Sequence, residues 1–236
     1  MKKIFIPVIC AVLLSLGAEE VVISQAKKFF PLSKKIPVDF TKNYTFTVKT
    51  KGGKGKLLVC FFQYNEAQRR IGAAQVWGNA DSVTELVAPA IRGASEFIVK
   101  DASKWKKPSP RSGTNIVAFN AKADGSDLPN FTIDYYIKDI TKLPDGTWKV
   151  EMRNPLRRSC RAGALVRQHY DGGHLSVTAP LPSAKTFSAS IQAAKGLGPH
   201  ANVWWPKAKF VQLSAMTTGD EPVTVVEWSL KETSAK

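Results

Sequence analysis

The residue types that most often catalyse reactions or bind metals are sparse in this chain. The histidines are His169, His174 and His200, and no HExxH or CxxC spacing accompanies them. His169, Asp171 and His174 could gather on a hairpin as metal ligands. The pair Gly172-Gly173 between them indicates a tight turn, which explains the local polar residues more simply. We therefore expect no metal site.

Signatures of other enzyme classes are missing from the sequence as well. It holds no GxSxG elbow, no Walker loop and no GxGxxG motif after a strand. A glycoside hydrolase or lyase needs two carboxylates that face each other across a cleft, and the nineteen acidic residues single out no such pair. We therefore predict a protein that is not an enzyme, with such a hydrolase or lyase as one alternative.

Tryptophan is the side-chain type that stands out instead. An indole ring either fills volume in a core or offers a flat apolar face to a ligand such as a sugar ring. Trp105 and Trp148 lie beside predicted strands, and Trp228 alternates with Val226 and Leu230 at the two-residue period of a strand. We expect these three tryptophans to pack in a core.

The other three tryptophans are candidates for ligand contact. Trp204 and Trp205 are adjacent, and neighbouring residues of an extended chain point to opposite faces. One of the two should therefore be exposed unless another element covers it. Trp77 lies in the turn-rich segment 75–79, where an indole can stand on a rim. The predicted ligand-binding residues are Trp77, Trp204 and Trp205, with Gln63, Tyr64 and Arg69 as polar partners where a strand ends at a rim.

Short alternating segments run through nearly the whole chain. Residues 43–49 alternate aromatic or β-branched side chains with polar ones, and the glycine-rich turn at 51–55 joins them to 57–64 as a hairpin. Many short strands, spaced by roughly 8–12 residues, predict an all-β sandwich, jelly roll or barrel. The further predicted strands are 96–100, 115–119, 131–140, 148–152, 164–169, 175–178, 185–192, 209–215 and 223–230.

Helical segments are few, and the spacing of predicted turns and strands changes in the middle of the chain. We expect a turn over 66–71 and one short helix over 83–91, where the residues are apolar enough. Tight turns and small strands concentrate between about 85 and 178. This change predicts a sandwich formed by residues 19–84 and 179–236, with 85–178 as an inserted β-rich module. Segments 40–64 and 185–230 should share that sandwich.

The first eighteen residues have the layout of a secretory signal peptide. A basic start, Met1-Lys2-Lys3, precedes an apolar run of thirteen residues at 4–16 and the small pair Gly17-Ala18. The run is shorter than the about 20 residues that a membrane-spanning helix needs, and no later run approaches that length. We expect removal of residues 1–18 and a secreted or periplasmic protein without a transmembrane segment. A retained membrane anchor is the alternative.

The remaining chain is strongly basic and holds two cysteines. The full sequence has a formal net charge of +15, and loss of Lys2 and Lys3 leaves +13. Such a surplus attracts anionic partners. Outside the cytoplasm these are acidic polysaccharide, anionic lipid or envelope polymer, and no motif indicates nucleic acid. A basic but functionally silent surface is the alternative. Cys60 lies in an apolar run and Cys160 among arginines, so we expect no disulfide.

Two parts of the sequence together suggest a family. Residues 32–39, 43–46 and 57–64 form the first part, and 204–213 with 223–230 form the second. They resemble the opening and closing strands of carbohydrate-binding modules with the galactose-binding-like jelly-roll fold, which occur in exported bacterial polysaccharide-utilisation systems. Between them, stretches that look like a β insertion of such exported proteins are 99–105, 117–119, 127–130 and 162–169.

The resemblance implies a jelly-roll sandwich that binds polysaccharide without catalysis. Modules of this fold often carry paired acids near the last strand, in or beside a calcium site, whereas this stretch reads Val226-Glu227-Trp228. We therefore expect no cofactor, with a structural calcium ion as the alternative. The net charge favours an acidic glycan as the ligand. The alternative from a different class is a structural or assembly protein of the cell envelope that uses the sandwich for protein–protein contact.

Overall fold

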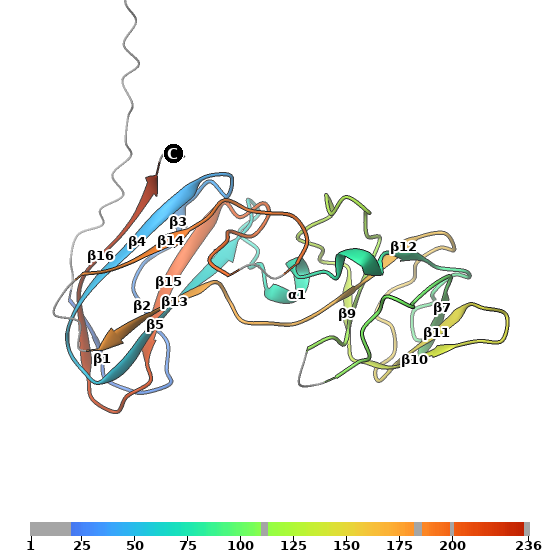
Figure 1. Ribbon diagram of the computed structural model, residues 1–236, viewed down its shortest axis with the longest axis horizontal. Coiled ribbons are helices and arrows are strands. Elements are labelled where there is room, and N and C mark those ends of the chain that lie inside the picture. The colour runs from blue at the N-terminus through green and yellow to red at the C-terminus, as the bar shows by residue number, and fades with distance from the viewer. Residues whose placement is uncertain (1–19, 110–112, 182–185, 199–200, 234–236) are drawn as a thin grey trace, which may run out of the picture.

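The protein consists of two β-rich lobes arranged end to end (Figure 1). The computed structural model describes residues 20–109, 113–181, 186–198 and 201–233. Within these ranges the chain forms sixteen strands, one short α-helix and one 3-10 helix, so the prediction of an all-β protein is confirmed. The predicted signal peptide over residues 1–18 and His200 lie outside the described residues.

The larger lobe is a sandwich of two antiparallel sheets, at the left of Figure 1. Sheet A has the strand order β1-β16-β4-β14, and sheet B has the order β13-β5-β15-β2, with β3 also paired to β15. Sheet A comprises β1 (Val21–Ile23), β4 (Asn43–Gly52), β14 (Phe187–Ile191) and β16 (Val223–Thr233). Sheet B comprises β2 (Phe30–Pro31), β3 (Ile36–Pro37), β5 (Gly55–Tyr64), β13 (Ser176–Leu181) and β15 (Phe210–Thr217).

The core of the sandwich follows from the two-residue period of its strands. In β4, Phe46 and Val48 are buried, while Thr47 between them is partly exposed. In β5, Phe61 faces the same core from the other sheet. The rings of Phe46 and Phe61 meet edge to face with 5.3 Å between their centroids. The predicted segments 40–64 and 185–230 therefore share one sandwich core.

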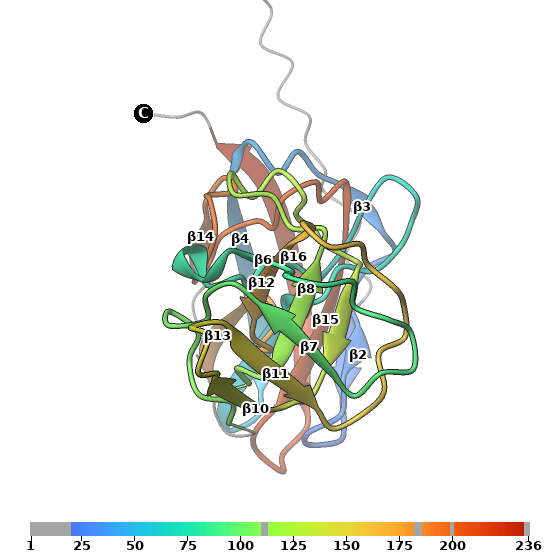
Figure 2. The ribbon, with the colours of Figure 1, turned by 90° about the vertical axis from the view of Figure 1, so that its right-hand side faces the viewer.

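The smaller lobe has two antiparallel sheets and a core of its own. Sheet C has the order β6-β12-β8-β9, and sheet D has the order β10-β11-β7. Figure 2 looks at the molecule from the end of this lobe, with sheet D toward the viewer. Sheet C comprises β6 (Thr84–Glu85), β8 (Ile116–Phe119), β9 (Ile133–Tyr135) and β12 (Leu165–His169). Sheet D comprises β7 (Glu96–Val99), β10 (Ile137–Lys142) and β11 (Trp148–Met152).

The smaller lobe is inserted between two neighbouring strands of sheet B. Strand β5 ends at Tyr64, and the chain returns to the sandwich as β13, where Ser176 lies opposite Cys60. The helices α1 (Ala73–Val76) and η1 (Ala80–Ser82) contact β12 and precede residue 85. The insertion therefore covers about residues 71–174, a range that begins and ends earlier than the predicted 85–178.

The short helix predicted over 83–91 is wrong. Thr84 and Glu85 form β6 and pair with β12, and Leu86 pairs with Val99. Extended backbone here buries Leu86 and Ala90 in the core of the smaller lobe, and the proline at position 89 has no N–H to give a helix. The apolar composition of this segment reflects burial of an extended chain.

The three tryptophans predicted to pack in a core do so. Trp105 is buried, and its indole Nε1–H donates to the carbonyl oxygen of Ser82 at 2.7 Å. Trp148 packs against the core of the smaller lobe, and Trp228 packs against the core of the sandwich. The two-residue period therefore identified the inward side of β16 at Trp228 and Leu230.

Cys60 and Cys160 are free and buried, so the prediction that no disulfide joins them is confirmed. Cys60 lies on β5 of the sandwich, whereas Cys160 lies in the core of the smaller lobe. Burial raises the pKa of the Cys60 thiol to about 11 and also raises the pKa of Cys160. Neither side chain is therefore a reactive thiolate at neutral pH.

Replacing Trp204 by alanine should lower the free energy of unfolding by about 3–5 kcal/mol. The indole is 1% exposed and meets the rings of Tyr44 and Phe61 edge to face, so its removal leaves a cavity in the sandwich core. Chemical denaturation followed by circular dichroism measures the change. Trp228→Ala removes a partly exposed indole from the same core and should cost less than half as much. Equal losses in the two variants would contradict this role of Trp204.

Candidate functional site

Trp77 lies where the two lobes meet, directly after α1. Its carbonyl oxygen accepts a hydrogen bond from the Tyr170 N–H at 3.1 Å, and Gly78 pairs with His169, so β12 holds this piece of backbone. The indole lies against Gly172, where an added Cβ atom would be 1.6 Å from the ring carbon Cζ3. The absence of a side chain at Gly172 therefore makes room for the Trp77 ring.

A buried charged network in β12 fixes the segment that carries Trp77. Arg167 is fully buried, and its Nη2 is 2.8 Å from Asp127 Oδ2. Its Nε donates to His169 Nε2 at 2.9 Å, and an arginine side chain has no acceptor. His169 Nε2 is therefore the unprotonated ring nitrogen. The protonated Nδ1 donates to the carbonyl oxygen of Ala74 in α1 at 2.8 Å, so one imidazole ties β12 to α1.

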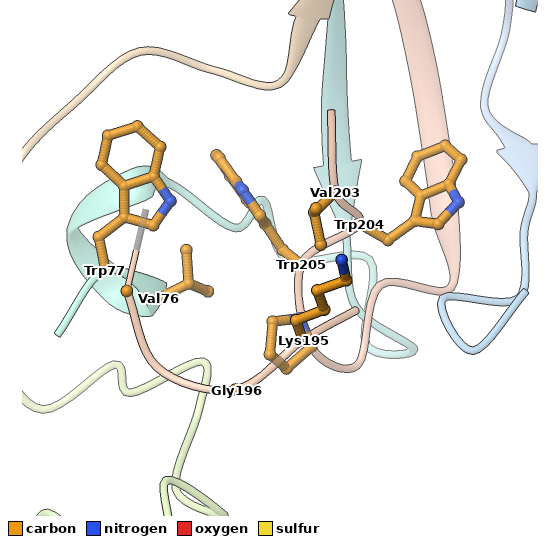
Figure 3. A pocket seen from close by; sticks show the side chains of 9 residues that line it. Val76, Trp77, Lys195, Gly196, Val203, Trp204 and Trp205 are labelled. Carbon is orange, nitrogen blue, oxygen red and sulfur yellow. The ribbon is translucent and has the colours of Figure 1, made fainter. Parts of the chain in front are cut away.

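The side chains of Trp204 and Trp205 point in opposite directions. Trp204 belongs to the sandwich core, whereas Trp205, only 4% exposed, packs with Ile71 and Val76 where the lobes meet. The Trp205 backbone N–H donates to Oε1 of Gln63 at 2.9 Å. Figure 3 shows the Trp204 indole turned away from those of Trp77 and Trp205. Both indoles are buried, because elements of the inserted lobe cover the side that Trp205 occupies, which is the exception that the sequence left open.

A pocket of about 350 Å³ opens beside Trp77 and Trp205. One indole comes from the inserted lobe and the other from the sandwich, so both lobes are needed to form it. Its volume lies at the lower end of the range for small-molecule sites, about 300–1,000 Å³. An adjoining hollow shares both indoles and includes Lys195 (Figure 3). The pocket is lined by Trp77, Gly173, His174, Leu175, Ser176, Ala201, Asn202 and Trp205.

His174 and Arg70 form a polar rim beside Trp205. The His174 ring is 5.0 Å from the Phe62 ring and 6.3 Å from the Trp205 ring, measured between centroids. Arg70 Nη2 is 3.1 Å from His174 Nε2, and the guanidinium carbon is 4.3 Å from the centre of the Phe62 ring. Because arginine only donates, His174 accepts through Nε2 and carries its proton on Nδ1. Burial and then the charge of Arg70 lower the pKa of His174, so its ring is neutral at pH 7.

The structure gives the predicted ligand-binding residues different surroundings. Trp77 and Trp205 meet at the pocket, whereas Trp204 fills the sandwich core. Gln63 was expected at a rim, but it is fully buried and its side-chain oxygen accepts from the Trp205 N–H. Gln63 therefore positions the backbone of Trp205 beside the pocket. That correction follows from strand alternation, since Gln63 is two residues after the buried Phe61 on β5.

Tyr64 and Arg69 do not line this pocket. The Tyr64 hydroxyl donates to Gln212 Oε1 at 3.1 Å, and the Arg69 guanidinium carbon is 3.8 Å from the centre of the Phe131 ring. The residues that sequence reasoning missed are Phe62 and Arg70. Phe62 had a readable signal, because it shares the outer face of β5 with Tyr64. Arg70 had none, because its position depends on how the chain turns after the strand.

The cluster considered for metal binding is not formed within the part of the chain that the structure describes, where no three His, Cys, Asp or Glu side chains gather as ligands. His169 uses one ring nitrogen for Arg167 and the other for Ala74. His174 instead accepts from Arg70 at the rim of the pocket. The site therefore combines two indoles with guanidinium and imidazole groups.

Comparisons with protein-family models, with curated proteins and with solved structures found no match to this chain. Among the described residues, no helix has the length and apolar character needed to cross a membrane.

Acidification from pH 6.5 toward pH 4 should destabilise the protein partly through His169. Burial, with the charge of Arg167 as the second cause, lowers the pKa of His169 from 6.5 to about 4. Between these values the unfolded chain binds a proton that the folded protein excludes, so stability falls as the pH falls. At 1.36 kcal/mol per pKa unit, the total contribution is about 3 kcal/mol.

His169→Gln removes this titration and keeps an oxygen that can accept from Arg167. Chemical denaturation across the same pH range should show a shallower loss of stability for the variant than for the unmodified protein. The comparison of slopes holds even if the variant is less stable at every pH. An identical pH slope in the two proteins would contradict a buried, neutral His169.

Proposed function

We propose that this protein binds polysaccharide at the pocket between its lobes and does not catalyse a reaction on it. The observation that carries the proposal is the meeting of two indoles from different lobes, Trp77 and Trp205, at one pocket. Flat apolar ring faces match the apolar faces of sugar rings, and aromatic side chains supply much of the binding free energy where they meet a ligand. Trp77 is partly exposed and offers the larger surface.

Polar groups around the indoles would fix the orientation of a sugar. Asn202 lines the pocket, and its amide offers both donors and an acceptor. The guanidinium group of Arg70, beside His174, offers donors alone. Sugar hydroxyls donate and accept, so this combination of a few polar groups with apolar surface suits a carbohydrate.

The class we propose is an exported carbohydrate-binding module of the galactose-binding-like jelly-roll type. Two antiparallel sheets that share one core support the fold assignment. The layout of residues 1–18 supports export to a secreted or periplasmic location. In this proposal the protein needs no cofactor, because binding rests on the indoles and the polar rim.

A second candidate is an assembly protein of the cell envelope, and one observation favours it. Strand β14 forms an edge of sheet A, and its Ser188 and Ser190 are exposed. An edge strand presents unpaired backbone groups to which another chain can add. Ser190→Lys should block such an addition. Loss of envelope association in this variant, with glycan binding unchanged, would favour the second candidate over the first.

Gly172→Ala should weaken polysaccharide binding at least tenfold without removing any atom that contacts ligand. The new Cβ would overlap the Trp77 indole, so the ring must leave its place at the pocket. Affinity electrophoresis measures the change, in gels containing xylan, galactan, glucomannan, alginate, polygalacturonate or chondroitin sulfate. Trp77→Ala should give a loss of the same size on the same polysaccharide.

Trp148→Ala is the matched control, since it removes an indole from the core of the same lobe, outside the pocket. It should bind as the unmodified protein does, and thermal melting establishes that all three variants are folded. The proposal fails if Gly172→Ala and Trp77→Ala keep full affinity. It fails equally if the unmodified protein is retarded by none of the six polysaccharides.

A further inference from the structure

The outer face of sheet B continues from the pocket as a surface of aromatic side chains. Along β5, Phe61 and Gln63 point inward, whereas Phe62 and Tyr64 are partly exposed on the other side. The Phe62 ring lies next to His174, which lines the pocket. Residues two apart on one strand lie about 7 Å from each other on the same face. Tyr64 is thus one step farther from the pocket than Phe62.

The turn after β5 places a cation on this surface. The Gln68 N–H donates to the Asn65 carbonyl oxygen at 2.9 Å, which reverses the chain. Arg70 then pairs with Tyr64 as an antiparallel bridge, so the two side chains emerge on the same face. The Arg70 guanidinium rests on the Phe62 ring, with its carbon 4.3 Å from the ring centre.

A second cation rests on the next aromatic ring. Lys35 lies just before β3, at the edge of sheet B, and its Nζ is 3.9 Å from the centre of the Tyr64 ring. The same Nζ donates to Gln68 Oε1 at 3.0 Å. Two cations are therefore held over two rings that follow each other along β5.

Neither of these cations is neutralised within the described residues. Their hydrogen-bond partners are His174 for Arg70 and Gln68 for Lys35, both uncharged at pH 7. No described carboxylate lies within 4.0 Å of either group. A cation on an aromatic ring is ordered but keeps its charge, so it still attracts an anion.

The part of the sandwich that precedes the insertion has a large excess of positive charge. Residues 20–70 hold eleven lysines and arginines against three acidic residues, whereas residues 71–174 hold fifteen against eleven. Several cations of the inserted lobe are paired, as Arg167 is with Asp127 and Arg157 with Asp134. This part of the sandwich therefore carries a larger excess of positive charge than the inserted lobe.

We propose that the polysaccharide is acidic and longer than the pocket, and that its anionic groups pair with Arg70 and Lys35 where the chain crosses Phe62 and Tyr64. This inference rests on the proposed function, because the chain enters the surface from the pocket. Arginine and lysine pair with carboxylate or sulfate groups through charge-assisted hydrogen bonds. Two cations in a row match a polymer that carries such groups repeatedly. In this proposal the pocket binds sugar rings, and the two cations favour a polymer that is anionic and longer than the pocket.

The test compares chain lengths in a double variant, Lys35→Gln with Arg70→Gln. From the acidic polysaccharide that the unmodified protein retains among alginate, polygalacturonate and chondroitin sulfate, a dimer and an oligomer of eight or more sugars are prepared. Isothermal titration calorimetry measures the affinity for both. The double variant should lose at least tenfold in affinity for the long oligomer and less than twofold for the dimer. Its affinity for the long oligomer should also depend less on salt, because surface charges are screened beyond about 8 Å at physiological ionic strength.

Lys49→Gln with Lys51→Gln is the matched control, since it removes the same charge from exposed lysines of β4, in the other sheet. It should bind the long oligomer as the unmodified protein does. Unchanged affinity of the Lys35/Arg70 variant, or an equal loss in the control, would overturn the inference. If Trp77→Ala still abolishes binding in that case, the proposed function stands without it.

Two other outcomes contradict the inference. Equal affinity of the unmodified protein for a neutral polysaccharide, unaffected by salt, would remove the role of charge while leaving the pocket as the glycan site. Binding to vesicles of anionic phospholipid, with none to any polysaccharide, would overturn both the inference and the proposed function.

Discussion

A hydrogen bond at Trp205 connects the packing of the sandwich to the formation of the pocket. The Trp205 N–H donates to the buried amide oxygen of Gln63, which holds the Trp204–Trp205 backbone against β5. Because adjacent side chains of an extended segment diverge, Trp204 enters the sandwich core and Trp205 faces the inserted lobe. Trp204 therefore stabilises the core of the larger lobe, and Trp205 packs where the two lobes meet.

The indole of the inserted lobe at this junction is that of Trp77, and it too is positioned through its backbone. Trp77 is held through its backbone by β12, whose Arg167 and His169 are buried and tied to Asp127 and to α1. Such a network is costly to break, since removal of one partner leaves a buried charge unpaired. The shape of the pocket therefore depends on the folded cores of both lobes. A ligand that contacts both indoles would stabilise the contact between the lobes.

Much of the fold could be predicted from the sequence, because strand alternation is a local signal. Segments such as 43–49 and 57–64 became β4 and β5, and the inward side of β16 followed from Trp228. The prediction of a helix over 83–91 was wrong, because a buried extended segment can be as rich in apolar residues as a short buried helix. At the site, alternation could have shown that Gln63 is inward. The contact of Arg70 with Phe62 could not be foreseen, because it depends on how the chain turns back after β5.

If glycan binds at the junction of the two lobes, the indole N–H resonances of the six tryptophans report it directly. Protein labelled with ¹⁵N-tryptophan is titrated with oligosaccharides of the retained polysaccharide, and each resonance is assigned from single variants. Binding at the junction predicts that the signals of Trp77 and Trp205 shift with ligand concentration, while those of Trp148 and Trp228 stay in place. Shifts confined to Trp148 or Trp228, or saturable binding with no change at Trp77 and Trp205, would contradict it.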